Sequence, residues 1–176
     1  MGMIHIQYCQ SRIGELILGA FDGRLCLLDF RYRKMRERVD KRIKRGLNTD
    51  YLEHDDPVLD LTRQQIDEYF IGDRRTFDLP LLMVGSDFQK RVWSVLMQIP
   101  YGETVSYLGL AKSINAEKAV RAVAAANGAN AMSLVIPCHR VIGRDGELIG
   151  YGGGLSAKKR LLQLEQAAGQ MSLGFE

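Results

Sequence analysis

The sequence is poor in cysteine and lacks any long uninterrupted run of apolar residues. Its three cysteines, Cys9, Cys26 and Cys138, form an odd and sparse set, which excludes a disulfide framework. No apolar run is long enough to cross a bilayer, and the first residues carry neither the basic region nor the apolar run of a signal peptide. We therefore expect a cytoplasmic protein whose thiols stay reduced.

A strong excess of one charge sign is also missing, but the charges are unevenly distributed. The formal net charge is +3 over 176 residues, which permits a polyanionic partner without requiring one. Residues 31–45 hold nine basic and two acidic residues, whereas residues 46–85 hold three basic and nine acidic ones. Residues 86–165 hold ten basic and six acidic residues and are the better electrostatic match to a nucleic acid. The run 31–45 fits a solvated helix or a mobile loop and could add to that surface.

The first part of the chain shows the alternation of strands. Ile4, Ile6 and Tyr8 alternate with polar residues, Glu15–Phe21 and Arg24–Phe30 are predicted to be two more strands, and Asp22-Gly23 is typical of a tight hairpin. A helix capped by Asp56 follows, and alternation over residues 77–81 predicts a last strand. Residues 1–85 are therefore predicted to form an α/β domain.

The pattern changes to helical spacing at Ser86. Ser86 and Gln89 form a capping-box pattern at the start of a helix, and Ser106 begins a second, shorter one. Asn115 can cap a third helix, Ala116–Asn127. Two short helices across a brief turn indicate a helix-turn-helix.

The end of the chain is predicted to carry a wing and a final helix. Residues 134–137 suggest a short extended run, and residues 141–151 a hairpin around Asp145-Gly146. Ser156 can cap a last helix, and residues 171–176 are expected to be a frayed tail. Residues 86–170 are thus predicted to be one mostly helical domain.

The run Pro137-Cys138-His139-Arg140 carries the candidate chemistry. A thiol with its usual pKa near ~8.5 is only a few per cent ionised at neutral pH, so a nucleophilic cysteine needs a nearby base. Neighbouring residues of a strand point to opposite faces, so adjacency of His139 does not by itself make it that base. Pro137 suggests a bent segment in which both side chains could reach one pocket. The run alone leaves a structural role for both residues open.

Several motifs around this run occur in a characteristic order over about residues 86–165. Together they resemble the O6-alkylguanine-DNA alkyltransferase family. Over residues 1–85 the resemblance is looser and rests on the strand pattern and Ile13-Gly14-Glu15-Leu16. The motifs are Phe88-Gln89-Lys90-Arg91-Val92-Trp93, Ile99-Pro100-Tyr101-Gly102-Glu103-Thr104-Val105-Ser106-Tyr107, Ala119-Val120-Arg121-Ala122-Val123, Ala126-Asn127-Gly128, Asn130, the Pro-Cys-His-Arg run and Gly150-Tyr151-Gly152-Gly153-Gly154-Leu155.

The resemblance implies a fold and a set of catalytic roles. The fold would be a ribonuclease-H-like α/β domain, with an antiparallel sheet plus helix, followed by a mostly α, winged-helix-like domain with a helix-turn-helix. Cys138 would accept the alkyl group, Glu165 would hold His139, and His139 would remove the thiol proton. Tyr107 would donate a hydrogen bond to a ring nitrogen of the base, and Asn130 would brace the active-site backbone.

The resemblance also implies residues that bind the base and the DNA. Val141, Tyr151 and Gly152 would line the base pocket. The helix Ala116–Asn127 would dock in the minor groove, because its small side chains lack the base-reading groups of a major-groove helix. Arg121 would enter the stack in place of the extruded base. The other implied DNA contacts are Ala122, Ala125, Ala126, Asn127 and Tyr107.

The expected function is DNA repair by irreversible, stoichiometric transfer of an alkyl group from O6-alkylguanine, and O4-alkylthymine, to Cys138. The partner would be double-stranded DNA, the protein a monomer, and neither a cofactor nor a metal is expected. Two other functions remain open: a DNA protein that binds damage without transfer, and a cysteine hydrolase. Three residues also keep alternatives: Glu165 as a surface charge, Tyr107 as a core aromatic, and Arg121 as a phosphate contact or salt bridge.

Overall fold

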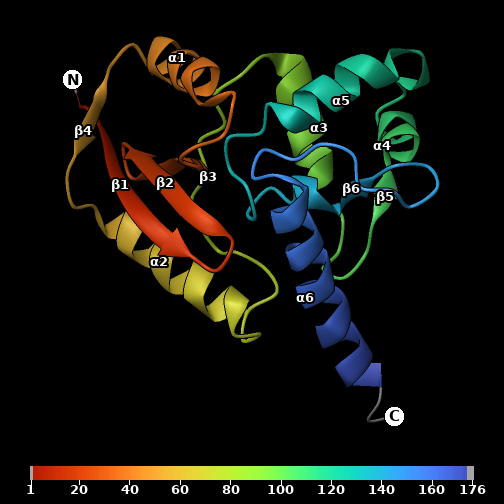
Figure 1. Cartoon of the computed structure of the whole chain (residues 1–176). Coiled ribbons are helices and arrows are strands. Elements are labelled where there is room, and N and C mark those ends of the chain that lie inside the picture. Colours follow the sequence, from red (N-terminus) through yellow and green to blue (C-terminus); the bar gives the residue numbers. More distant parts are fainter. Residues whose placement is uncertain (1, 174–176) are drawn as a thin grey trace. The chain divides into compact units, whose positions relative to one another are not determined.

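The computed structural model describes residues 2–173 and divides the chain into two compact units, residues 1–86 and 87–176 (Figure 1). The first unit contains a four-stranded sheet in the order β3-β2-β1-β4. The strands β1 (Ile4–Ser11), β2 (Gly14–Phe21) and β3 (Arg24–Phe30) pair antiparallel as predicted. Asp22 and Gly23 both have positive φ, 50° and 74°, which is the backbone that a tight hairpin requires.

The fourth strand differs from the sequence analysis. β4 (Tyr51–Glu53) pairs parallel to β1, so the sheet is mixed. Its three residues are too few to show an alternating pattern. The prediction of a strand over residues 77–81 is wrong: within this segment Leu81 alone pairs, through one isolated bridge to Leu25. Pro80 has no N–H and cannot donate to a ladder, although its carbonyl accepts from Leu25 at 2.8 Å.

Two helices belong to this unit. α2 (Pro57–Phe70) begins as predicted, with the Asp56 side chain accepting from the N–H of Val58 at 2.9 Å. Its apolar face contacts the sheet, along which it lies in Figure 1. α1 (Arg36–Leu47) covers most of the basic run 31–45, so this run is largely helical and not a loop. The buried residues of α1 are Val39 and Ile43.

The basic run is not simply a solvated face. Arg33 and Arg36 both bind the fully buried Asp29, at 3.0 and 2.9 Å, and Arg42 donates to the carbonyl of Val84 at 3.1 Å. These arginines act within the domain, because a buried carboxylate must be paired. Lys34, Arg38 and Arg45 are exposed.

The second unit begins with the helical motif. α3 (Asp87–Leu96) is followed by α4 (Tyr107–Ser113), which Ser106 caps by accepting from the N–H of Gly109 at 2.9 Å. α5 (Val120–Gly128) contacts both helices, in agreement with the helix-turn-helix prediction. The predicted cap at Asn115 is wrong: this residue has φ +56°, and a 3₁₀ turn over Glu117–Ala119 precedes α5.

The segment before the candidate nucleophile is not extended as expected. Residues 133–135 form turns, and Leu134 has φ +72°. The short strands β5 (Val105–Ser106) and β6 (Val141–Ile142) pair parallel to each other. The predicted hairpin after β6 is present only as a turn, in which the N–H of Gly143 donates to the carbonyl of Glu147 at 2.8 Å. The returning chain forms no strand there, and the loop runs on to the last helix.

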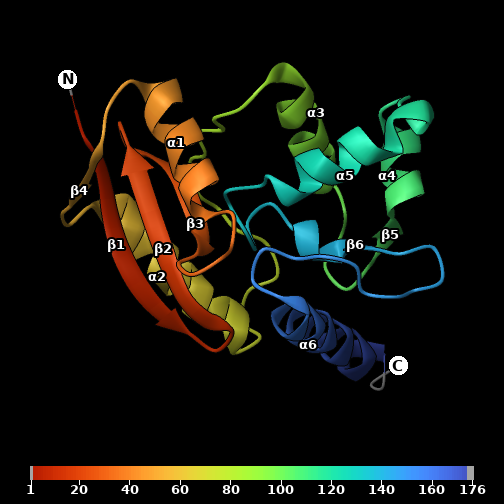
Figure 2. The same ribbon diagram turned by 45° about the horizontal axis from the view of Figure 1, so that its top comes forward.

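That last helix, α6 (Leu155–Leu173), begins one residue before the predicted cap Ser156 (Figure 2). Its backbone extends to Leu173, so the predicted tail over 171–176 is helical in its first three residues. Residues 174–176 lie outside the described part of the chain. None of the helices described has the length and apolar content to span a membrane.

Candidate active site

Cys138 lies in a 3₁₀ turn, Cys138–Arg140, and is only 7% exposed. The N–H of Cys138 donates to the carbonyl of Ile136 at 2.8 Å, and that of Arg140 donates to the carbonyl of Pro137 at 3.0 Å. In a 3₁₀ helix successive side chains are about 120° apart rather than on opposite faces. Cys138 and His139 are therefore not forced onto opposite faces, as they would be in a strand, and both side chains can reach one site.

Asn130 supports the backbone that leads into this turn. Its side-chain amide donates to the carbonyl of Ile136 at 2.8 Å, and its side-chain oxygen accepts from the N–H of Met132 at 2.9 Å. Asn130 is itself buried, so these bonds are sheltered from water. Its location agrees with the bracing role that the resemblance implies.

His139 and Glu165 form a buried pair. His139 Nε2 lies 2.8 Å from Glu165 Oε1, and neither side chain is exposed by more than 1%. Glu165 is therefore not a surface charge. An ionised carboxylate can only accept, so Nε2 carries the proton and Nδ1 presents a lone pair. Among the described residues, Nδ1 has no hydrogen-bond partner.

The two groups of this pair have opposite charge states. Burial lowers the pKa of His139 and outweighs the opposing effect of Glu165, so the imidazole is neutral at neutral pH. Burial alone would raise the pKa of Glu165, but hydrogen bonds from His139 and Arg140 outweigh it and lower that pKa to about 2. The site thus holds a neutral base oriented by an ionised carboxylate.

Arg140 belongs to the same cluster, although the sequence analysis gave it no role. Its Nε and Nη2 donate to Oε2 and Oε1 of Glu165 at 3.0 and 2.9 Å. Its Nη1 donates to the carbonyl of Ile99 at 2.6 Å. The only sequence signal was its place in the Pro-Cys-His-Arg run.

Lys158 is a second residue that the sequence analysis missed. Its ammonium is fully buried and donates to the carbonyls of Val141 at 2.6 Å and of Ile149 and Gly150 at 3.2 Å. It thereby joins both ends of the loop after β6. Burial lowers the pKa of Lys158, against an opposing effect of Cys138. Its position two helical turns before Glu165, on the same face of α6, was the available signal.

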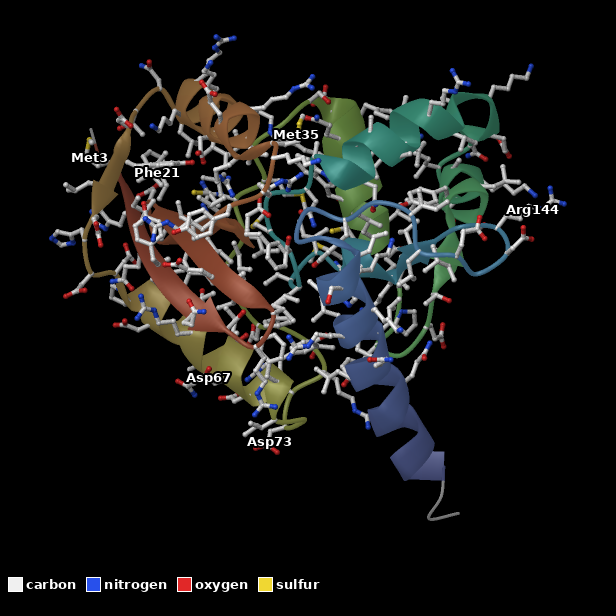
Figure 3. The ribbon with its side chains drawn as sticks, in the orientation of Figure 1. Met3, Phe21, Met35, Asp67, Asp73 and Arg144 are labelled. Carbon is white, nitrogen blue, oxygen red and sulfur yellow. The ribbon has the colours of Figure 1, made fainter. Side chains whose placement is uncertain are left out.

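The predicted base-pocket residues lie around this loop. Tyr107, the first residue of α4, donates to the carbonyl of Ile149 at 2.8 Å. Burial raises the pKa of Tyr107, and Cys138 adds to that effect, which places the two side chains near each other. Val141 is buried, whereas Tyr151 and Gly152 are half-buried. Figure 3 shows Arg144 at the outer end of the loop, pointing away from the ribbon.

The predicted DNA-binding residues of α5 separate into two sets. Arg121, Ala122 and Ala125 are exposed, whereas Ala126 and Asn127 are only 3% and 6% exposed. The carbonyl of Ala126 accepts from the indole of Trp93 at 2.8 Å, which fixes that face of the helix toward α3. Among the side chains that the structure describes, Arg121 has no ion-pair partner, so the intramolecular salt bridge is not found in this part of the chain.

The other cysteines and histidines of the chain lie in the first unit. In the described residues no group of three or more His, Cys, Asp or Glu side chains could hold a metal ion. Cys9 and Cys26 lie on β1 and β3, and burial raises the pKa of Cys26 to about 12. His5 pairs with Asp56 at 2.9 Å. Cys138, by contrast, lies in the same 3₁₀ turn as His139.

Family models match both units of the chain. The model described as 6-O-methylguanine DNA methyltransferase, ribonuclease-like domain, matches residues 4–83. The model described as 6-O-methylguanine DNA methyltransferase, DNA binding domain, matches residues 87–167.

Curated relatives carry a corresponding name. Proteins named methylated-DNA–protein-cysteine methyltransferase include one from Methanosarcina barkeri, 43% identical over 157 residues, which cover 89% of this chain and 94% of the relative. One from Mycobacterium bovis is 52% identical over 103 residues, or 58% of this chain. That match spans 62% of the Mycobacterium bovis protein, less than two thirds of its length.

Solved structures from Mycobacterium tuberculosis are also similar. The O6-methylguanine methyltransferase structure has a TM-score of 0.79 and 38% identity, over 94% of each chain. The OGT structure in complex with DNA has a TM-score of 0.78 and 39% identity, over 93% of this chain and 94% of that one.

Proposed function

Because the chain belongs to the 6-O-methylguanine DNA methyltransferase family, we propose that it repairs DNA by moving an alkyl group from O6 of a modified guanine to Sγ of Cys138. The observation that carries this proposal is the buried Cys138 turn, in which the neighbouring imidazole is neutral and is held by Glu165. O4-alkylthymine, whose alkyl group is also attached to an exocyclic oxygen of the base, is the proposed second substrate.

The first step is activation of the thiol. The N–H at Nε2 of His139 continues to donate to Glu165, while Nδ1 accepts the Cys138 proton through one bridging water. The imidazolium that forms is stabilised by the ionised carboxylate of Glu165. Neutral His139 is the required starting state, because an imidazolium could not accept the proton.

The second step is displacement at the alkyl carbon. The sulfur–carbon bond forms as the carbon–oxygen bond breaks, and the electron pair of that bond goes to the purine. Tyr107 stabilises the departing purine anion by donating its hydroxyl to a ring nitrogen. The step needs no cofactor, since the thiolate supplies the electrons and the purine accepts them. The resulting thioether has no good leaving group, so each molecule acts once.

The DNA must present the base outside the helix, because the alkylated oxygen lies within the duplex. Arg121 is exposed and would fill the vacated position, and the small, exposed side chains of Ala122 and Ala125 would allow close approach to the minor groove. The arginine is proposed as the inserted residue rather than as a phosphate contact. We further propose that the protein acts as a monomer in the cytoplasm.

Mass spectrometry after mixing the protein with an alkylated duplex oligonucleotide tests the function. The expected result is one added alkyl group per protein, located on the peptide that contains Cys138, with none on the Cys138→Ala variant. No added mass would identify a protein that only binds damage. Repeated turnover without added mass would identify a hydrolase, whose intermediate must be labile to water.

A further inference from the structure

The carboxylate of Glu165 accepts hydrogen bonds from two side chains, the imidazole of His139 and the guanidinium of Arg140. Its Oε1 accepts from His139 at 2.8 Å and from Arg140 Nη2 at 2.9 Å, and its Oε2 accepts from Arg140 Nε at 3.0 Å. A weaker contact from the N–H of Gly102 reaches Oε2 at 3.4 Å. Arg140 thus binds both oxygens of Glu165, whereas His139 shares only one of them.

We infer that Arg140 is a positioning residue of the proposed transfer: by binding both oxygens of Glu165, it balances the carboxylate charge and leaves His139 neutral and able to accept the Cys138 proton. Without this balance, a buried carboxylate would favour a charged imidazolium as its partner. An imidazolium would orient correctly but could not act as the base. The inference rests on the proposed function of Cys138.

Further contacts hold the guanidinium of Arg140 in place. Its third nitrogen, Nη1, donates to the carbonyl of Ile99 at 2.6 Å, and the guanidinium carbon lies 5.7 Å from the ring centre of Tyr101. Arg140 is itself buried, so water does not compensate for loss of these contacts. A lysine at this position would keep the charge but lack the planar fork that contacts both oxygens.

The charged groups around His139 determine how the loss of Arg140 would change the pKa of His139. Glu165 and Lys158 face it from α6, and Arg140 and Cys138 lie on its own turn, while Tyr107 on α4 is close to Cys138. Arg140 and Lys158 lower the pKa of His139, and Glu165 raises it. Removing Arg140 therefore removes one opposing charge and at the same time leaves Glu165 unbalanced, and both changes favour the imidazolium.

The test is the pH dependence of single-turnover transfer from an alkylated duplex, from about pH 5 to about pH 9. In Arg140→Gln we expect the acid limb of the profile to move to higher pH, with a loss of about tenfold or more near pH 6.5 and a loss of about threefold or less near pH 8.5. Arg160→Gln, which removes an exposed charge from the same helix as Glu165, should keep the wild-type profile. An equal loss at all pH values, with an unmoved acid limb, would show a merely structural role and overturn the inference.

A second measurement does not depend on transfer. The imidazole of His139 is titrated by nuclear magnetic resonance in Cys138→Ala and in Cys138→Ala with Arg140→Gln. The inference requires a higher pKa of His139 in the double variant, and an unchanged or lower value overturns it. If wild-type protein transfers no alkyl group while this shift occurs, the proposed function fails and the role of Arg140 in setting the charge of His139 stands.

Arg140→Lys is the fallback if Arg140→Gln does not fold. Its single ammonium balances Glu165 less completely than the planar guanidinium does, so the acid limb should still lie at higher pH than in the wild type. An unmoved limb in the lysine variant overturns the inference in that case.

Discussion

The hydroxyl of Tyr107 donates a hydrogen bond of 2.8 Å to the carbonyl of Ile149, in the loop that follows the Cys138 turn. Lys158 donates to the same carbonyl at 3.2 Å. A ring nitrogen of the substrate would take the place of Ile149 as the acceptor for Tyr107. Because Lys158 remains, the Ile149 carbonyl would keep a donor when this exchange occurs.

Tyr107→Phe should slow the transfer more than it weakens DNA binding. Loss of one donor to the departing purine raises the barrier by roughly 1–3 kcal/mol. Single-turnover rates at saturating protein, together with binding constants for the same alkylated duplex, separate the two effects. A rate constant equal to that of the wild type would rule out a leaving-group role.

Cys138→Ala should abolish transfer and retain binding to alkylated duplex DNA. The exposed face of α5 and the pocket backbone do not depend on the thiol. Cys9→Ala, a change of a thiol on β1, is the matched control and should transfer normally. Dealkylation by the Cys138 variant would show that the nucleophile is a different residue.

Arg121→Ala should impair transfer from duplex DNA more than transfer from a free alkylated base. The reason is that only the duplex requires a nucleotide to be extruded and its place to be filled. Transfer rates on the two substrates, with the same variant preparation, make the comparison. Equal losses on both would favour a phosphate contact or a structural role for this exposed side chain.

Glu165 should make the stability of the second unit depend on acid pH. Its pKa is depressed from an ordinary value of 4.5 to about 2 in the folded protein. A depressed pKa means that the stabilising contribution is fully present above the unfolded value and is lost as the pH falls toward the folded value. Melting temperatures measured between about pH 5 and about pH 2 should therefore decline, and Glu165→Gln should decline less steeply.

Glu165→Gln should also be less stable than the wild type at neutral pH. Removing the carboxylate leaves the buried Arg140 unpaired, a change that typically costs about 3–5 kcal/mol. A variant with wild-type stability at neutral pH and a wild-type acid transition would contradict the assignment of this ion pair as a stabilising element.

Each molecule should act once, and alkylation should weaken the fold. Cys138 is nearly buried, and added carbon atoms in a packed interior typically cost ~1–3 kcal/mol. We expect the alkylated protein to melt several degrees lower, about 2–8 °C, with larger alkyl groups lowering it further. Product counted against protein tests the first claim, which more than one repaired base per molecule would defeat. An unchanged or higher melting temperature would defeat only the second.

Local patterns were sufficient to predict most helices and strands. Strand alternation and the Asp22-Gly23 turn predicted the antiparallel strands, and Asp56-Pro57 predicted the start of α2. These features act over a few residues, so the sequence carries them directly. The ordered motifs likewise indicated the family, which the comparisons confirm, and Cys138 as the candidate nucleophile, which stays a prediction.

The tertiary structure decided which charges are buried and which partners they meet. Arg140 and Glu165 are 25 residues apart in sequence, and Lys158 meets the carbonyl of Val141 across 17. Whether a charged side chain is solvated or buried depends on such distant partners. A charge can be buried without a large loss of stability only where a counter-charge or several carbonyl groups pair with it. For the same reason the sequence could indicate Cys138 and His139 as candidates, while only the folded 3₁₀ turn and α6 showed that the imidazole of His139 is buried and oriented by Glu165.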